Sequence, residues 1–248
     1  MEREEIIRLD RLLVSRGFGT RSEVQRLIRR GAVRGEKGEL KKPDHRVSTQ
    51  ISLWVYGALS EPPPRLVVYH KPLGILSTLR DPWGRAGLDF VLPEAWRPHL
   101  HPVGRLDADT SGLLLFSSDG GLTQRLLHPK RMIPRCYQAF VSALPENLEG
   151  QLAQGVETAL GVFCATLESV KLLKIEDLRP QGAEEAVALV QVSVIEGKHR
   201  MVRRLLHNAG ASVLALHRVS YGLILLDDLP CGQYRIVSEE ELERLSNL

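Results

Sequence analysis

The decisive stretch of this sequence is HPVGRLDADTSGLLLF, residues 101–116. Its last four residues, 113–116, are apolar and predict a buried strand, whereas the twelve before them carry charged and hydroxyl side chains between glycines. We therefore expect a charged loop at the end of a buried strand. Active sites are often built on such loops, because the sheet holds the backbone while the loop presents its side chains. The candidate side chains are Arg105, Asp107, Asp109, Thr110 and Ser111.

Two alternatives compete with an active-site loop. The first is an exposed turn in which an arginine and an aspartate form a structural ion pair. The second is the DxDxT nucleophile motif of haloacid-dehalogenase-type phosphatases, which Asp107 and Asp109 superficially match. That motif needs a hydrophobic strand before it and a threonine at its fifth position. Here the strand follows and the fifth residue is Ser111, so the phosphatase interpretation is weak.

A second charged cluster is EGKHRMVRRLLHNAG, residues 196–210. A helix that begins near Lys198 would place an apolar face against the core and a row of basic side chains on its other face. Basic groups in a row repel one another unless anions neutralise them, so we expect RNA phosphates or an active-site carboxylate nearby. A solvated helix face is the alternative. The basic side chains of the row are Arg200, Arg203, Arg204 and His207.

Short apolar strands and amphipathic helices surround these two clusters. Predicted strands lie at residues 66–69, 113–116, 137–143 and 187–195. Predicted helices lie at residues 122–127, 148–154, 201–208 and 239–245. Strands and helices do not alternate strictly, which argues against a βαβ arrangement. We predict an α+β fold in which a small helical and β-stranded module precedes a larger domain with a central mixed, mostly antiparallel sheet flanked by helices.

The first sixty residues predict that small module. Apolar spacings of three and four indicate two short helices with a break at residues 17–20, and Thr20 and Glu23 have the spacing of a capping box. Short strands are expected at 32–56. Three prolines at 62–64 favour a stiff, extended connector. We therefore place the module at residues 1–59, a linker at 60–64 and the larger domain at 65–248.

Positive charge is concentrated in this module. Residues 1–50 contain 13 Lys and Arg against 8 Asp and Glu, whereas the rest of the chain has a net charge of −2. The excess points to a polyanion such as RNA, because clustered cations gain affinity by releasing counterions from phosphates. A solvated charged face is the alternative. The basic residues of the second helix expected to contact RNA are Arg21, Arg26, Arg29 and Arg30.

The composition excludes several classes of protein. The chain has 248 residues, a formal net charge of +3 and 43% hydrophobic residues, which is typical of a globular protein and not of a disordered or collagen-like one. Three cysteines at unpatterned spacing fit neither a disulfide framework nor a zinc site, so we expect a reducing cytoplasm. We expect no export signal, membrane span, metal or nucleotide cofactor, because the sequence lacks their motifs.

Three blocks occur in the order HKPLGILST at 70–78, PVGRLDADTSGLLLF at 102–116 and EGKHRMVRRL at 196–205. In these blocks the sequence resembles the RsuA/RluB type of bacterial ribosomal RNA pseudouridine synthases. Residues 9–33 are similar to the S4 RNA-binding domain that precedes the catalytic domain in this family. The usual VxVNG ending of that domain is missing, since Arg34 follows Val33, and this leaves open which RNA contacts the turn makes.

The resemblance implies that uridine is isomerised to pseudouridine without cofactor or metal: the base leaves its bond to the sugar, rotates and reattaches through carbon 5. The family's catalytic aspartate maps onto Asp107, and its base-stacking tyrosine maps onto Tyr137. The basic residue that pairs with the aspartate maps onto Arg203, with Lys198 as a further contributor. The uridine must be flipped into the pocket, and Arg105 is the candidate to hold it or to fill its place. Further expected RNA contacts are Arg200 and Arg204.

The expected partner is ribosomal RNA or a pre-ribosomal particle, bound by a monomer. The DPWGR segment at 81–85 and the wording of the third block favour a site in 16S rRNA, and a site in 23S rRNA is the alternative. The competing function is a non-catalytic RNA-binding factor in ribosome assembly. The presence of Asp107, Tyr137 and Arg203 argues against it, because a binding protein could lose any of the three.

Overall fold

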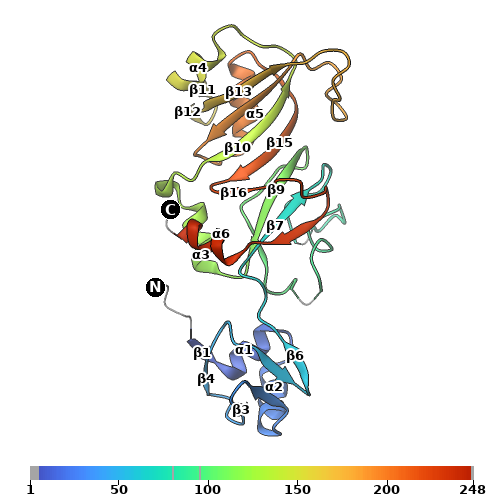
Figure 1. The fold of residues 1–248 in the computed structure, drawn as a ribbon, viewed down its shortest axis with the longest axis vertical. Coiled ribbons are helices and arrows are strands. Elements are labelled where there is room, and N and C mark those ends of the chain that lie inside the picture. Colours follow the sequence, from blue (N-terminus) through green and yellow to red (C-terminus); the bar gives the residue numbers. More distant parts are fainter. Residues whose placement is uncertain (1–5, 80, 95, 247–248) are drawn as a thin grey trace. The chain divides into compact units, whose positions relative to one another are not determined.

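The computed structural model describes residues 6–79, 81–94 and 96–246, which form two compact units (Figure 1). The first unit ends at Arg65 and also takes in Leu92–His101. The second unit comprises Leu66–Val91 and the chain from Pro102 onward. Within the described ranges, no helix is long and apolar enough to cross a membrane.

The first unit consists of two helices packed on short strands. Its helices are α1 (Leu9–Ser15) and α2 (Arg21–Arg29). Its strands are β1 (Ile6–Arg8), β2 (Val33–Gly35), β3 (Gly38–Glu39), β4 (Arg46–Ser48), β5 (Leu53–Val55) and β6 (Ala58–Ser60). Strand β1 pairs with β4, and the other four form a sheet in the order β3-β2-β5-β6. A core that includes Leu9, Leu13, Val24 and Ile28 joins the helices to the strands.

Local sequence signals define helix α2 at both ends. The Thr20 hydroxyl accepts a hydrogen bond from the Glu23 backbone N–H, and the Thr20 N–H donates to the Glu23 carboxylate, so the predicted capping box is confirmed. The helix stops before Gly31, whose φ of +77° is one that glycine adopts without strain. The four arginines predicted on this helix are all exposed: Arg21, Arg26, Arg29 and Arg30.

The second unit is built on one nine-stranded sheet with the order β13-β14-β10-β15-β9-β7-β17, to which β16 and β8 are added at β15 and β9. Along this order only β9 and β15 run parallel, and the other neighbours are antiparallel. The central strands are β7 (Leu66–Lys71), β9 (Thr110–Ser117), β10 (Arg135–Val141), β14 (Ala188–Val194) and β15 (Val213–Tyr221). The remaining strands of this sheet are β8 (His101–Val103), β13 (Thr166–Leu172), β16 (Ile224–Leu225) and β17 (Tyr234–Ile236). Strands β11 (Val156–Thr158) and β12 (Gly161–Phe163) form a separate two-stranded sheet. The predicted mixed, mostly antiparallel sheet is confirmed.

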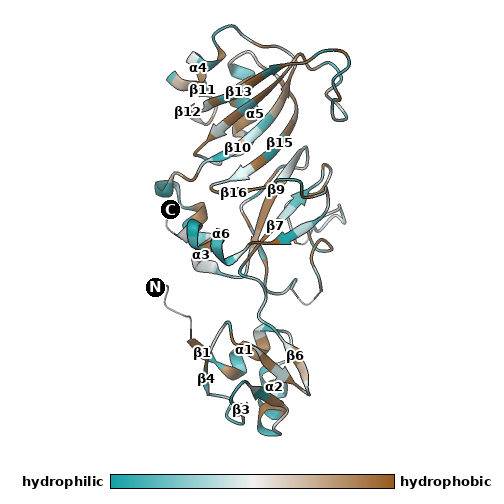
Figure 2. Ribbon diagram, viewed as in Figure 1, coloured by the Kyte–Doolittle hydropathy of each residue, from teal (hydrophilic) through white to brown (hydrophobic). Residues whose placement is uncertain are grey.

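Helices lie on this sheet where the apolar periodicity predicts them. They are α3 (Gly120–Leu127), α4 (Leu148–Gln154), α5 (Met201–Asn208) and α6 (Glu239–Ser246), with a short 3-10 helix at Pro129–Arg131. The main core joins β7 and β9 to α3 and α6 through residues such as Leu66, Leu115, Leu126 and Leu242. Strand β9 is apolar along most of its length (Figure 2). With these helices, the predicted α+β class is confirmed.

A glycine permits the parallel pairing of β9 with β15. Gly112 is paired with Arg218, and a Cβ atom at Gly112 would collide with the Arg218 backbone. The pairing extends β9 back to Thr110, three residues earlier than the apolar run predicts. The charged loop is therefore shorter than expected, and Asp107 lies close to the start of the strand.

Candidate active site

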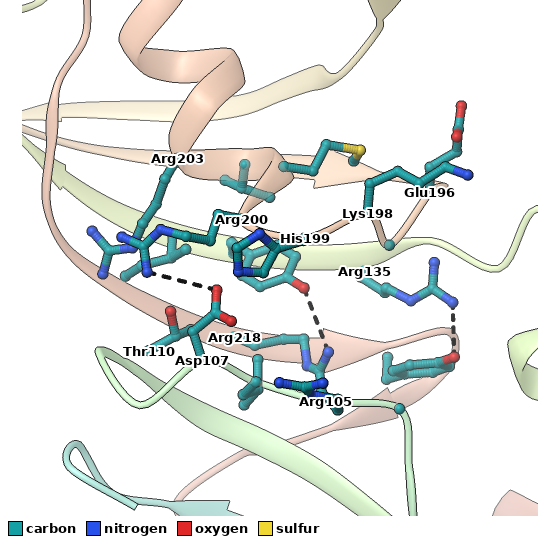
Figure 3. Close-up of a pocket in the computed structure, with 18 of the residues that line it drawn as sticks. Arg105, Asp107, Thr110, Arg135, Glu196, Lys198, His199, Arg200, Arg203 and Arg218 are labelled. Carbon is teal, nitrogen blue, oxygen red and sulfur yellow. Dashed lines mark hydrogen bonds and ion pairs between the residues drawn. The ribbon is translucent and has the colours of Figure 1, made fainter. Parts of the chain in front are cut away.

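A cavity of about 350 Å³ lies among the charged loop, the strands β10 and β15, and the segment that enters α5 (Figure 3). This is the size of a pocket for a small ligand. It is lined by the three residues that the resemblance singles out, Asp107, Tyr137 and Arg203, together with Arg105, Lys198 and Arg200.

The loop that carries Asp107 is held by hydrogen bonds on both sides of that residue. The Ser77 hydroxyl donates to the carbonyl of Leu106 at 2.6 Å and accepts from its N–H at 3.0 Å. On the other side, the Gly74 N–H donates to the carbonyl of Ala108 at 2.8 Å. The Asp107 side chain is 26% exposed, so water and solutes reach it. The loop backbone is thus fixed while the carboxylate remains accessible.

Buried Lys71 holds the end of the same loop by hydrogen bonds to backbone carbonyls. Its side chain is fully buried and its ammonium donates to the carbonyls of Pro72 and Thr110, both at 2.9 Å. Burial lowers the pKa of Lys71 to about 8, although the charges of Asp107 and Asp109 favour its protonated form. The ammonium therefore ties the end of β7 to the start of β9.

Arg200 lies between two carboxylates. Its guanidinium donates to Asp109 through two hydrogen bonds, at 3.1 and 2.8 Å, and its Nη1 is 3.9 Å from Oδ2 of Asp107. Burial by itself raises the pKa of Asp109, but the hydrogen bond from Arg200 and the charge of Arg203 outweigh it, so the pKa is lowered. Asp109 is therefore ionised at neutral pH.

The structure corrects two expectations for this segment. Helix α5 begins at Met201 and not near Lys198, and Arg200 precedes it with a φ of +52°, in the left-handed region. The resemblance implies that Arg203 pairs with Asp107. Instead, Arg203 lies 3.4 Å from the Asp109 carboxylate and donates to the Asp109 carbonyl at 2.6 Å, while Arg200 is the residue that reaches Asp107. The left-handed turn at Arg200 directs its side chain toward the loop.

Two buried arginines and two tyrosines lie on the strand side of the cavity. Arg218, which is 2% exposed, donates from Nε to the carbonyl of Leu113 at 2.7 Å and from Nη1 to the Tyr137 hydroxyl at 3.4 Å. Arg135 donates to the Tyr221 hydroxyl at 2.9 Å, and its guanidinium lies 4.8 Å from the centre of that ring. Figure 3 shows Arg218 and Arg135 among the side chains that line the pocket. Cation–π contacts of this kind stabilise guanidinium groups away from water.

These arginines were not predicted from the sequence. Arg135 begins β10 and Arg218 lies within β15, and both occupy buried positions. A basic residue at a buried position of a mostly apolar strand was the signal available. Among the predicted residues, Arg204 lies on α5 but outside the lining of the cavity, whereas Arg105 and Lys198 line it and are exposed. Ser111 does not line the cavity, and its hydroxyl is hydrogen-bonded to Nδ1 of His217 at 2.9 Å.

No group of three or more histidine, cysteine, aspartate or glutamate side chains in the described part of the chain could hold a metal ion. The polar lining instead consists mainly of arginine and lysine side chains, together with the carboxylates of Asp107 and Glu196. Such a lining suits an anionic substrate.

Comparison with known proteins identifies this arrangement. The model of the RNA pseudouridylate synthase family matches residues 65–208, which carry Asp107, Tyr137 and Arg203, and the S4 domain matches residues 7–50. The chain belongs to the RNA pseudouridylate synthase family. It is therefore an isomerase that forms pseudouridine in RNA, and the resemblance seen in the sequence is confirmed.

Individual relatives agree with the family. The chain is 33% identical to the uncharacterized RNA pseudouridine synthase YtzG of Bacillus subtilis, over 97% of this chain and 98% of that protein. It is 35% identical to the ribosomal large subunit pseudouridine synthase B of Vibrio cholerae, over 97% of this chain and 74% of that protein. A crystal structure of a pseudouridylate synthase superposes with a TM-score of 0.61 at 25% identity, covering 96% of this chain and 99% of that one.

Proposed function

We propose that this pseudouridine synthase acts on one uridine of ribosomal RNA, with Asp107 as its catalytic carboxylate. The observation that carries the proposal is the position of Asp107: its accessible carboxylate lines the cavity from a loop that is hydrogen-bonded on both sides. Such bracing holds a reacting group in place without further ordering when substrate binds. The Nη1 atom of Arg200 lies 3.9 Å from Oδ2 of Asp107 and places a positive charge beside the carboxylate.

The other lining residues take roles that follow from their chemistry. Tyr137 presents a ring in the cavity wall, where it can stack on the flipped uracil. Arg203 holds the loop by donating a hydrogen bond to the Asp109 carbonyl. Its positive charge also interacts with the carboxylate of Asp107. Arg105 and Lys198 are exposed at the cavity and suited to the phosphates of the flipped nucleotide.

The N-terminal module serves as the RNA anchor in this proposal. In sequence terms the proposed RNA-binding domain is residues 1–59, the linker 60–64 and the catalytic domain 65–248. By contacts, the compact unit of the RNA-binding domain extends to Arg65 and also takes in Leu92–His101. The exposed arginines of α2 support this role, because they offer cations to the phosphate backbone independently of base sequence. An enzyme that acts on bacterial ribosomal RNA would work in the cytoplasm. Its substrate would be either free RNA or a pre-ribosomal particle. The proposed enzyme acts as a monomer.

The names of the relatives favour the large ribosomal subunit. The Vibrio cholerae protein and a second Bacillus subtilis relative, 30% identical over 97% of this chain, are both named ribosomal large subunit pseudouridine synthase B. We therefore propose a 23S rRNA uridine in place of the 16S site that the DPWGR segment favoured.

The test uses ribosomal RNA from a strain that lacks this gene. The RNA is incubated with the wild-type protein, with Asp107→Asn or with the surface control Asp228→Asn, and pseudouridines are mapped by carbodiimide-dependent primer extension across 16S and 23S rRNA. We expect one new stop in 23S rRNA with wild type and control, and none with Asp107→Asn. An active Asp107→Asn variant would overturn the assignment of the catalytic residue.

Two further outcomes decide the substrate. A stop that forms only on partly assembled subunits would make the substrate a ribonucleoprotein particle. No stop on RNA or particles, with RNA binding retained, would overturn the proposed reaction on ribosomal RNA and favour a non-catalytic assembly factor.

A further inference from the structure

The turn at residues 81–85, DPWGR, presents an aromatic side chain that the catalytic site does not use. The Trp83 side chain is 78% exposed. Large aromatic side chains usually lose most of their exposure on folding, because they contribute strongly to hydrophobic burial. An exposed tryptophan on an ordered turn is therefore a candidate contact surface.

The turn is held rigidly by Asp81. Its carboxylate accepts hydrogen bonds from the backbone N–H groups of Trp83 and Arg85, at 3.1 and 2.9 Å, and from the Arg85 guanidinium at 2.7 Å. These bonds lower the pKa of Asp81 to about 2, so the turn keeps its charge at any physiological pH. A ligand that binds Trp83 meets a backbone that is already ordered, which reduces the entropy cost of binding.

The loop that carries the turn is anchored to the catalytic loop. Backbone hydrogen bonds from Leu76 to Ala86 and from Leu88 to Thr78 close its base, at 2.9 and 2.7 Å. Ser77, between them, is the residue that holds Leu106 beside Asp107. Trp83 follows Ser77 by six positions, so their Cα atoms lie within roughly 20 Å of each other. That distance corresponds to a few nucleotides of RNA.

The charges of the turn indicate which kind of contact it makes. The Arg85 guanidinium lies 5.0 Å from the centre of the Trp83 ring and is neutralised by Asp81. The turn therefore offers little net charge to phosphates. Aromatic side chains bind single-stranded nucleic acid by stacking on bases, and Arg contributes through cation–π contacts.

We propose that Trp83 is a stacking platform for an unpaired base of the RNA substrate, a few nucleotides from the uridine in the cavity. The inference rests on the proposed function, because it assumes an RNA strand that crosses the catalytic domain. Trp83 is a positioning residue in this scheme, and it does not touch the reacting atoms.

The test compares Trp83→Leu, which removes the ring but keeps an apolar side chain, with Trp83→Phe, which keeps a ring. Leu178→Ala, at a leucine that is 97% exposed in another loop of the same unit, is the matched control. Affinity for ribosomal RNA is measured at several salt concentrations. We expect Trp83→Leu to bind roughly 5- to 100-fold more weakly, as base stacking predicts. The salt slope should stay unchanged, because the tryptophan ring neutralises no phosphate. Trp83→Phe should retain most of the affinity.

A second readout does not depend on activity or on the identity of the target. Tryptophan emission is followed while a single-stranded oligouridylate is added to wild type and to Trp83→Phe, and the difference between them isolates Trp83. Quenching of that difference signal supports stacking even if the protein forms no pseudouridine in ribosomal RNA, which would count against the proposed function alone.

Three results would overturn the inference. Wild-type affinity in Trp83→Leu would show that the ring does not contact RNA. Weaker binding with a salt slope reduced by about one would indicate a phosphate contact. A defect seen only on ribosomal particles, with naked RNA bound normally, would assign Trp83 to a protein surface.

Discussion

Arg200 and Asp109 form a two-bond ion pair at the entrance of helix α5, with N–O distances of 3.1 and 2.8 Å. The pair fixes the guanidinium beside Asp107, which belongs to the same loop as Asp109. Bidentate arginine–carboxylate pairs specify direction as well as charge. Asp109 therefore positions the cation that faces Asp107, the proposed catalytic carboxylate.

Replacing Arg200 with lysine keeps the charge but loses this geometry. We expect kcat to fall about tenfold, the loss of roughly 1.4 kcal/mol of transition-state stabilisation. Arg204→Lys is the matched control, because Arg204 follows in the same segment but does not line the cavity. Single-turnover rates on the mapped rRNA fragment measure the effect. Equal rates for the two variants would show that the Arg200–Asp109 geometry has no part in the reaction.

Arg218 links the strand that follows Asp107 to Tyr137. Its Nη2 is buried and has no hydrogen-bond partner among the described residues. We expect Arg218→Met to lower kcat by about tenfold or more, because Tyr137 loses the donor at its hydroxyl. The Tm should change little or rise, because an incompletely paired buried charge is removed.

A double-mutant cycle with Tyr137→Phe separates this effect from a general disturbance of the core. If Arg218 acts through the tyrosine hydroxyl, Arg218→Met should have little further effect on kcat once that hydroxyl is gone. Fully additive losses of kcat would contradict the link between the two residues.

The arginines of α2 should set the salt dependence of RNA binding. Replacing Arg26, Arg29 and Arg30 with glutamine should weaken binding and reduce the slope of log K against log salt by about 0.7 to 0.9 for each phosphate that is no longer neutralised. The control is Arg244→Gln, at an exposed arginine paired with Glu240 on helix α6. An unchanged slope would remove the module as the electrostatic anchor. Substitution is a cleaner test than deleting residues 1–60, because Leu92–His101 belongs to the same unit.

His217 should make folding sensitive to mild acid. Burial, helped by the neighbouring His70, lowers the pKa of His217 to about 4 from an ordinary value of 6.5. Between pH 6.5 and 4 the unfolded chain therefore binds a proton that the folded protein does not, so stability is lost as the pH falls through this window. The contribution to the slope is at most about 1.4 kcal/mol per pH unit.

Denaturant unfolding at a series of pH values, compared between wild type and His217→Gln, measures this contribution. The variant should show a shallower decline of the unfolding free energy between pH 6.5 and 4. Parallel curves would show that His217 gains its proton equally in the folded and unfolded states.

Short-range signals in the sequence predicted much of the fold. Helix α4 begins and ends at the residues that apolar periodicity indicates, and Thr20 caps α2 through a partner three residues away. The family and the candidate residue Asp107 were also predicted from the sequence, because one contiguous block of residues carries both. These features depend on neighbours within one or two turns of chain, so a linear pattern is enough to specify them.

The tertiary structure alone decided which charges meet. Arg203 was expected to face Asp107, yet the left-handed backbone at Arg200 puts that side chain there instead. The role of Arg218 depends on a parallel pairing between strands that are about a hundred residues apart, made close by the missing side chain of Gly112. Periodicity says which face of an element is buried, but not which distant side chain lies opposite. That choice is made by packing between elements. The sequence therefore determined the family and the candidate loop around Asp107, while the folded chain determined which side chains contact one another in the site.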